Sequence, residues 1–166
     1  MSRILSFAWT TPAFVTGHKT CTRRNWKPRY ADTFQAGEIL QAWNKSPRCG
    51  AGAFRVGDIR LTEDVLLQRT ADAPESDFQA EGFAFLQKIG HTLALDGGPH
   101  LTPGDLWLSW KDAPNVMRYV VRFQLLSLTP AGQELREKYE AEAAAADAQP
   151  KLPFGAIPAP QKGGTK

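Results

Sequence analysis

The apolar runs of this chain are short, and turns that contain glycine or proline separate many of them. The 166 residues, 42% of them hydrophobic, fit one domain with a real core plus appendages. We expect strands where short runs are rich in strand-forming residues or alternate apolar with polar ones, at residues 4–9, 20–26, 39–43, 54–56, 59–61, 106–108 and 119–126, and a further apolar run lies at 65–67. The pattern predicts an α+β fold with five to seven short strands curled into a small barrel and one or two helices.

Two segments favour helices. Acidic residues at the start of the segment that begins with Pro74 favour a helix there, and its apolar stripe runs from Phe78 to Ile89. Residues 131–148 are rich in Ala and Glu and predict an appended helix. Residues 90–104, rich in Gly and Pro, predict a long loop or insertion, and residues 149–166 a disordered Pro/Gly-rich tail.

Composition excludes several classes of protein. The two cysteines, Cys21 and Cys49, are too few for a disulfide scaffold, and with three scattered His they lack metal-ligand spacing. We therefore expect no metal site and no cofactor. The N-terminus lacks a signal-peptide pattern, and no run approaches the ~20 apolar residues of a membrane helix. The sequence predicts a cytoplasmic protein without a membrane partner.

Positive charge is concentrated in the first third of the chain. Residues 1–57 hold nine Lys or Arg against Asp32 and Glu38, a net of +7 in a chain of net +3. This asymmetry favours an anionic partner such as phosphate, unless the charges cluster by chance. The candidate phosphate-binding residues are Lys27, Arg29, Lys45 and Arg48.

The most informative stretch is Gly17-His18-Lys19-Thr20-Cys21-Thr22-Arg23-Arg24. A glycine turn brings Lys19 to the start of a strand, and Thr22 and Arg24 then share one face of it. An ammonium, a hydroxyl and a planar guanidinium would meet there, a set that suits an anion or a polar planar group. The alternative is an ordinary basic edge strand that faces water.

A second candidate residue is Glu81. It lies three residues after Phe78 and four before Phe85, on the apolar stripe of the predicted helix. A carboxylate there must find a partner or reach a cleft, unless it lies at the edge of the stripe and extends into solvent. The adjacent Gly82 permits a close approach of backbone.

These segments together resemble the ASCH family of the PUA-like superfamily. The stretch 17–24 resembles its Gly-x-Lys-Thr-x-Thr-x-Arg signature, Ala80-Glu81-Gly82-Phe83 its Glu-Gly-Phe helix motif, residues 34–40 its next turn and strand, and residues 119–123 its closing strand. The resemblance covers residues 3–128 and implies a PUA-like barrel over residues 1–130. One branch of the family hydrolyses cytidines acylated on the exocyclic amine, and its catalytic Lys, Thr and Glu match Lys19, Thr22 and Glu81.

The resemblance implies amide hydrolysis with Thr22 as nucleophile, Lys19 as its base and Glu81 as proton donor or ring-binding group. Arg24, with Arg23 beside it, would bind substrate and stabilise the oxyanion. Trp9 or Trp26 would stack on the base, although each could be plain core or rim.

Two alternative functions stay open, and one motif in the tail suggests a separate partner. The cleft could instead read a base within RNA or DNA without catalysis, in which case binding would weaken steeply with salt. Other ASCH proteins are described as ribonucleases, but two basic residues and a carboxylate without a metal set argue weakly for that activity. Finally, Gln149–Phe154 resembles short peptides that dock on bacterial sliding clamps, a match that chance could also produce.

Overall fold

The structure is a computed structural model that describes residues 3–94 and 98–149. Six strands form one sheet in the order β1-β3-β4-β8-β2, with β5 also paired to β8. Their bounds are β1 Ile4–Ser6, β2 Cys21–Arg24, β3 Ile39–Trp43, β4 Arg55–Leu61, β5 Leu66–Arg69 and β8 Met117–Leu128. A separate two-stranded ribbon joins β6 (Leu93–Ala94) to β7 (His100–Leu101).

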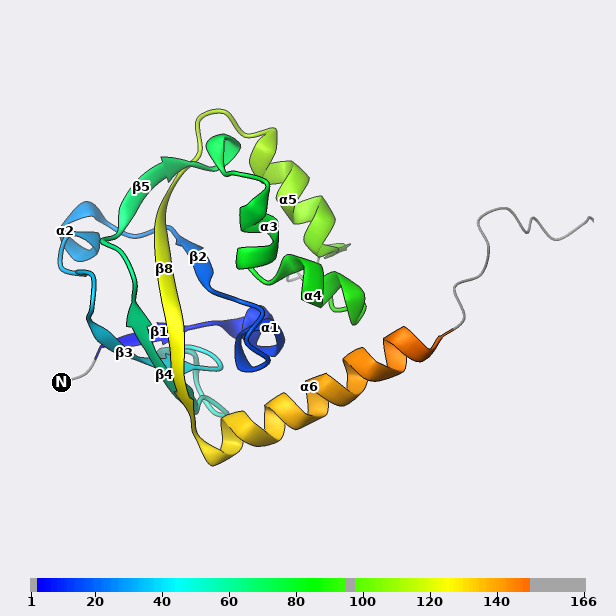
Figure 1. The fold of residues 1–166 in the computed structure, drawn as a ribbon. Coiled ribbons are helices and arrows are strands. Elements are labelled where there is room, and N and C mark those ends of the chain that lie inside the picture. Colours follow the sequence, from blue (N-terminus) through cyan, green and yellow to red (C-terminus); the bar gives the residue numbers. More distant parts are fainter. Residues whose placement is uncertain (1–2, 95–97, 150–166) are drawn as a thin grey trace, which may run out of the picture.

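The sheet is mixed and curled (Figure 1). β1 runs parallel to β3 and all other pairs are antiparallel. β8 pairs with β4 through its second half, whereas its first half lies between β5 and β2. The β3–β4 pairing shifts register after Ala42, and the β4–β8 pairing shifts after Asp58. Such irregularities bend strands, and they help the sheet to curl.

The predicted α+β class and the curled sheet are confirmed, but the sheet is a half-barrel. Over the residues described, no backbone pairing joins the edge strands β1 and β2. The Arg24 side chain spans this opening instead, because its Nη2 donates to the carbonyl oxygen of Ser6. The sheet is therefore barrel-like, and the finer PUA-like assignment stays a prediction.

Most helices lie on one side of the curled sheet, whereas the short helix at 28–31, labelled α2, lies on the other (Figure 1). Their bounds are α1 Thr11–Val15, α2 Pro28–Ala31, α3 Ser76–Ala80, α4 Phe83–Lys88, α5 Pro103–Lys111 and α6 Pro130–Ala148, with 3-10 turns η1 Ala8–Thr10, η2 Pro47–Cys49 and η3 Thr70–Asp72. α6 follows β8 directly and packs against α1 and β4 through Leu135, Tyr139 and Ala143. The predicted helix at 131–148 is thus confirmed, with one side against the core.

Two apolar clusters form the core. One fills the hollow of the sheet and includes Phe7, Phe14, Leu40, Ile59 and Phe123. The other lies among the helices and includes Phe83, Leu86 and Trp107. A cavity beside Lys19 and Glu81 is lined by residues of both clusters.

Three predicted elements differ from the structure. The strand from Ile4 ends at Ser6 rather than at Trp9, because η1 begins at Ala8. The helix predicted through Ile89 is two helices, because Gly82 adopts φ +81° between them. Residues 106–108, predicted as a strand, lie within α5, whose start is defined by Pro103 and a capping box between Thr102 and Asp105.

The predicted insertion at 90–104 contains the β6–β7 ribbon and the first residues of α5. Most of the predicted disordered tail and of the clamp-like peptide Gln149–Phe154 lies outside the described residues, which end at Gln149. None of the described helices combines the length and the apolar character that crossing a bilayer requires.

Candidate functional site

The turn after α1 places Lys19 between α1 and the α3–α4 junction. Gly17 adopts φ +79°, and the His18 amide donates to the carbonyl of Ala13 at 2.8 Å. The Thr20 amide then donates to the carbonyl of Ala80 at 2.8 Å, and the Thr20 carbonyl accepts from the Phe123 amide. The segment is thereby tied to α3 on one side and to β8 on the other, and Lys19 is buried.

The junction between α3 and α4 brings Glu81 to Lys19. Glu81 is the C-cap residue that follows α3, and Gly82 turns the chain into α4. A Cβ on Gly82 would lie 2.4 Å from the Cβ of Ala13 and 3.2 Å from that of Lys19, so the backbone passes closer than any other residue would allow. The Lys19 ammonium donates to Glu81 Oε2 and to the Glu81 carbonyl, both at 2.8 Å.

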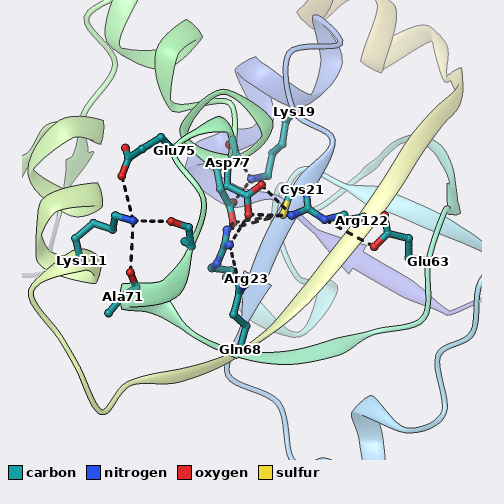
Figure 2. A network of polar contacts seen from close by, with 12 residues as sticks. Lys19, Cys21, Arg23, Glu63, Gln68, Ala71, Glu75, Asp77, Lys111 and Arg122 are labelled. Carbon is teal, nitrogen blue, oxygen red and sulfur yellow. Dashed lines mark hydrogen bonds and ion pairs between the residues drawn. The ribbon is translucent and has the colours of Figure 1, made fainter.

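The second oxygen of Glu81 is held by Arg23. Arg23 Nη1 donates to Glu81 Oε1 at 3.0 Å, and Nη2 donates to Asp77 Oδ2 and to Gln68 Oε1. Arg122 on β8 donates to both Asp77 oxygens at 2.9 and 3.0 Å. Figure 2 shows Arg23 and Arg122 converging on Asp77, which lies between them. Each Glu81 oxygen thus has its own buried cation.

The sequence analysis did not identify Asp77 and Arg122 as site residues. Asp77 was interpreted only as an acid at a helix start, yet it is 1% exposed. The sequence does contain a signal for an acidic partner such as Asp77. If β2 is buried and Arg23 points inward, the guanidinium needs a buried carboxylate beside it. Arg122 pairs with Cys21 across the strands, a register that only the assembled sheet defines.

Positive charge exceeds negative charge in this buried region. The buried Lys19 and Arg23 and the half-buried Arg24 and Arg122 lie with the buried carboxylates of Glu81 and Asp77, and Arg122 also approaches the exposed Glu63 at 3.9 Å. In the part of the chain that the structure describes, the buried Nε atoms of Arg23 and Arg24 have no hydrogen-bond partner. An acceptor or anion from a ligand would satisfy such donors.

Burial changes the acid–base properties of two groups here. It lowers the pKa of the Lys19 ammonium, against the opposing charge and hydrogen bond of Glu81. Burial, together with the negative charge of Glu81, raises the pKa of the Cys21 thiol to about 12. Lys19 is therefore brought closer to a usable base, whereas Cys21 stays a protonated, unreactive thiol.

A cavity of about 150 Å³ opens beside these groups. It is lined by six residues that the sequence analysis singled out: Lys19, Thr22, Glu81, Arg23, Arg24 and Trp9. The Thr22 hydroxyl forms none of the hydrogen bonds of the network described above. The cavity is smaller than the ~300–1,000 Å³ of pockets for drug-sized ligands, so it suits a single ring or a small group.

Aromatic and aliphatic side chains complete the walls. Phe7, Phe83, Leu106 and Trp110 line the cavity and were not identified from the sequence. The rings of Trp9 and Phe83 stack with centroids 5.7 Å apart and 28° between their planes. The cavity lining therefore combines aromatic rings with charged groups, and Arg23 and Arg24 lie 5.9 and 6.0 Å from the ring centroids of Trp110 and Phe7.

The other predicted site residues lie elsewhere. Trp26 stacks on Phe34 at 4.6 Å and does not line the cavity. Lys27, Arg29 and Arg48 are exposed and Lys45 is half-buried. Arg48 borders a surface depression with Ser6 and Tyr30, and Lys45 borders another that shares Ala8 and Trp9 with the cavity.

The described residues contain no group of three or more His, Cys, Asp or Glu side chains arranged to hold a metal ion. In the comparisons with known proteins, no family model, curated protein or solved structure matches this chain. The resemblance to the ASCH family therefore rests on the sequence motifs alone and stays a prediction.

Proposed function

We propose that the cavity binds the base of an acylated cytidine and that Lys19, Thr22 and Glu81 hydrolyse its amide. The observation that carries this proposal is the buried Lys19–Glu81 pair, 2.8 Å apart, in the wall of a cavity that Thr22 also lines. A buried ion pair is a poor way to stabilise a fold. At a cavity wall, however, it can hold an amine ready for proton transfer.

The reaction would run through an acyl-threonine. Neutral Lys19 accepts the proton of the Thr22 hydroxyl while the hydroxyl oxygen attacks the amide carbon, forming a tetrahedral intermediate. The carbon–nitrogen bond then breaks, the exocyclic nitrogen receives a proton, and cytidine leaves. Water cleaves the resulting ester, which releases the carboxylic acid and restores the Thr22 hydroxyl.

The pKa of Lys19 and two other groups assist these steps. The lowered pKa of Lys19 increases the fraction of neutral amine at a given pH. Glu81 orients that amine through Oε2 and takes part in returning the proton to the leaving nitrogen. The guanidinium of Arg24, which lines the cavity and has a free Nε donor among the described residues, stabilises the oxyanion.

The test is hydrolysis of N4-acetylcytidine followed by chromatography of released cytidine. Thr22→Ala, Lys19→Met and Glu81→Gln should each reduce kcat/KM by at least about 100-fold. Thr33→Ala changes a threonine outside the cavity and serves as the control with unchanged turnover. Wild-type turnover that survives all three site changes would contradict the proposal.

A second candidate function is a module that binds the same base within RNA or DNA. It is favoured by Lys27, Arg29, Lys45 and Arg48, which form no ion pair within the described chain. Lys45 borders a depression that shares Ala8 and Trp9 with the cavity, where the sugar and phosphate of a base in the cavity would lie, and Arg48 borders a separate depression. The affinity for a single-stranded oligonucleotide should then fall with a log–log salt slope of about −0.7 per phosphate contact. Combined Arg48→Gln and Lys45→Gln changes should flatten that slope, and a slope near zero in the wild type would exclude this function.

A further inference from the structure

We infer that α5 limits the size of the acyl group that the cavity accepts, with Leu106 and Trp110 as the residues that determine specificity. The inference rests on the proposed function, and it adds a substrate class: amides with a small acyl group such as acetyl, rather than aromatic acyl groups. It concerns a helix that lies outside the motifs of the charged site.

The geometry of α5 directs two side chains to the cavity. Leu106 and Trp110 are four residues apart and therefore share one face of the helix. Both line the cavity, whereas Leu108, between them in sequence, is 61% exposed. α5 thus presents an apolar edge to the cavity and a different face to solvent.

The position of α5 is held firmly. Trp107 is buried and its Nε1 donates to Glu75 at 3.3 Å. Lys111 Nζ lies 3.1 Å from Glu75 Oε1, and it donates to the carbonyls of Ala71 and Ala73. Figure 2 shows Lys111 between Glu75 and Ala71. The Thr70 hydroxyl donates to the Trp110 carbonyl at 3.0 Å. A wall anchored at both its buried face and its C-terminal end does not yield easily to a bulky ligand.

The Trp110 ring occupies space beside the reacting groups. Its centroid lies 5.4 Å from that of Phe83 and 5.9 Å from the Arg23 Cζ. Arg23 in turn holds Glu81 Oε1. Since the whole cavity measures about 150 Å³, a heterocycle leaves little room for a second ring. The indole of Trp110 is, with that of Trp9, the largest side chain that lines the cavity, and its removal would enlarge the space.

The experiment compares N4-acetylcytidine with N4-benzoylcytidine. The wild type should favour the acetyl substrate, and Trp110→Ala should raise the benzoyl-to-acetyl ratio of kcat/KM by about tenfold or more, because the removed indole leaves space for the phenyl ring. Leu106→Ala should shift the ratio in the same direction by a smaller factor. Leu108→Ala, on the solvent face of the same helix, should leave the ratio unchanged.

The outcomes separate this inference from the proposed function. Turnover of acetylcytidine with the same ratio in the wild type, Trp110→Ala and Leu106→Ala would overturn the role of α5 and leave the proposed function intact. Turnover of neither substrate by the wild type would overturn both. Should Trp110→Ala fail to fold, as judged by circular dichroism, Leu106→Ala decides the question alone, because its side chain is smaller and half-buried.

Discussion

The cavity has two walls of different chemistry and origin. The charged wall comes from β2 and the α3–α4 junction and holds Lys19, Arg23 and Glu81 in hydrogen bonds of defined geometry. The aromatic wall comes from η1, α4 and α5 and holds Trp9, Phe83 and Trp110 in ring contacts. The first wall concentrates reactive groups, and the second shapes the space in which they act.

Because the walls differ in this way, substitutions in the charged wall and in the aromatic wall should affect stability and ligand binding to different extents. Removing one member of a buried charge network leaves its partners unpaired, which costs free energy of folding as well as function. Removing one ring at the edge of a cavity mostly enlarges the cavity. Stability measurements should therefore respond most to the charged wall, and ligand measurements should respond to both.

The largest effect is expected for Glu81→Gln. Lys19 and Arg23 would lose their common carboxylate in a buried site, and the free energy of unfolding at pH 7 should fall by about 3–5 kcal/mol. Urea unfolding measures the change. Glu63→Gln is the control, because that side chain is 66% exposed and lies 3.9 Å from Arg122, and its effect should stay within about 0.5 kcal/mol. Equal effects of the two changes would mean that the buried charge network contributes no more to stability than an exposed ion pair does.

The next effect concerns the close approach at the α3–α4 junction. Gly82→Ala places a methyl group 2.4 Å from the Ala13 Cβ and also strains a backbone with φ +81°. Gly90 has φ +66° and open space around it, so Gly90→Ala carries only the backbone strain. We expect Gly82→Ala to destabilise the protein by about 1–3 kcal/mol more than Gly90→Ala does, measured by urea unfolding. Equal losses would mean that the approach of Gly82 to α1 is unimportant.

The aromatic wall should show its effect in binding. Trp9→Ala should weaken the binding of cytidine, measured by calorimetry, by about 1–3 kcal/mol, because a stacking surface is lost. Trp26→Ala removes an indole that stacks on Phe34 outside the cavity, and cytidine affinity should not change. If both substitutions weakened cytidine binding equally, the assignment of Trp9 to the wall would be wrong.

The smallest effect is a contrast between the two cysteines. The pKa of the Cys21 thiol is raised from 9.0 to about 12, chiefly by burial, whereas Cys49 is exposed. At pH 8 a thiol reagent should modify Cys49 within seconds to minutes and leave Cys21 unmodified until the protein unfolds. The Cys49→Ser variant should therefore show no fast-reacting thiol. A rapid second modification in the native protein would show that the charged wall is open to solvent.

The same thiol makes stability fall at high pH. Its pKa is higher in the folded protein than in the unfolded chain, so the unfolded chain loses its proton first as pH rises above about 9. The free energy of unfolding should then decline between pH 9 and 12 more steeply in the wild type than in Cys21→Ala.

The local pattern of the sequence was sufficient for much of the charged wall. The stretch from Gly17 to Arg24 identified Lys19, Thr22, Arg23 and Arg24, and the position of Glu81 among apolar residues indicated a carboxylate that needs a partner. The structure places all five at one cavity. Short-range signals also predicted β3, β8 and α6, because alternation, strand-forming residues and an Ala-rich segment act within a few residues of the chain.

Only the tertiary structure decided the rest. Asp77 and Arg122 meet because β2 and β8 pair in one register and α3 packs beside them. Leu106 and Trp110 reach the cavity because a capping box turned an apparent strand into α5 and Glu75 anchors it. Contacts between residues 30 or more positions apart depend on packing and register rather than on local preference, and no pattern within a single segment encodes them.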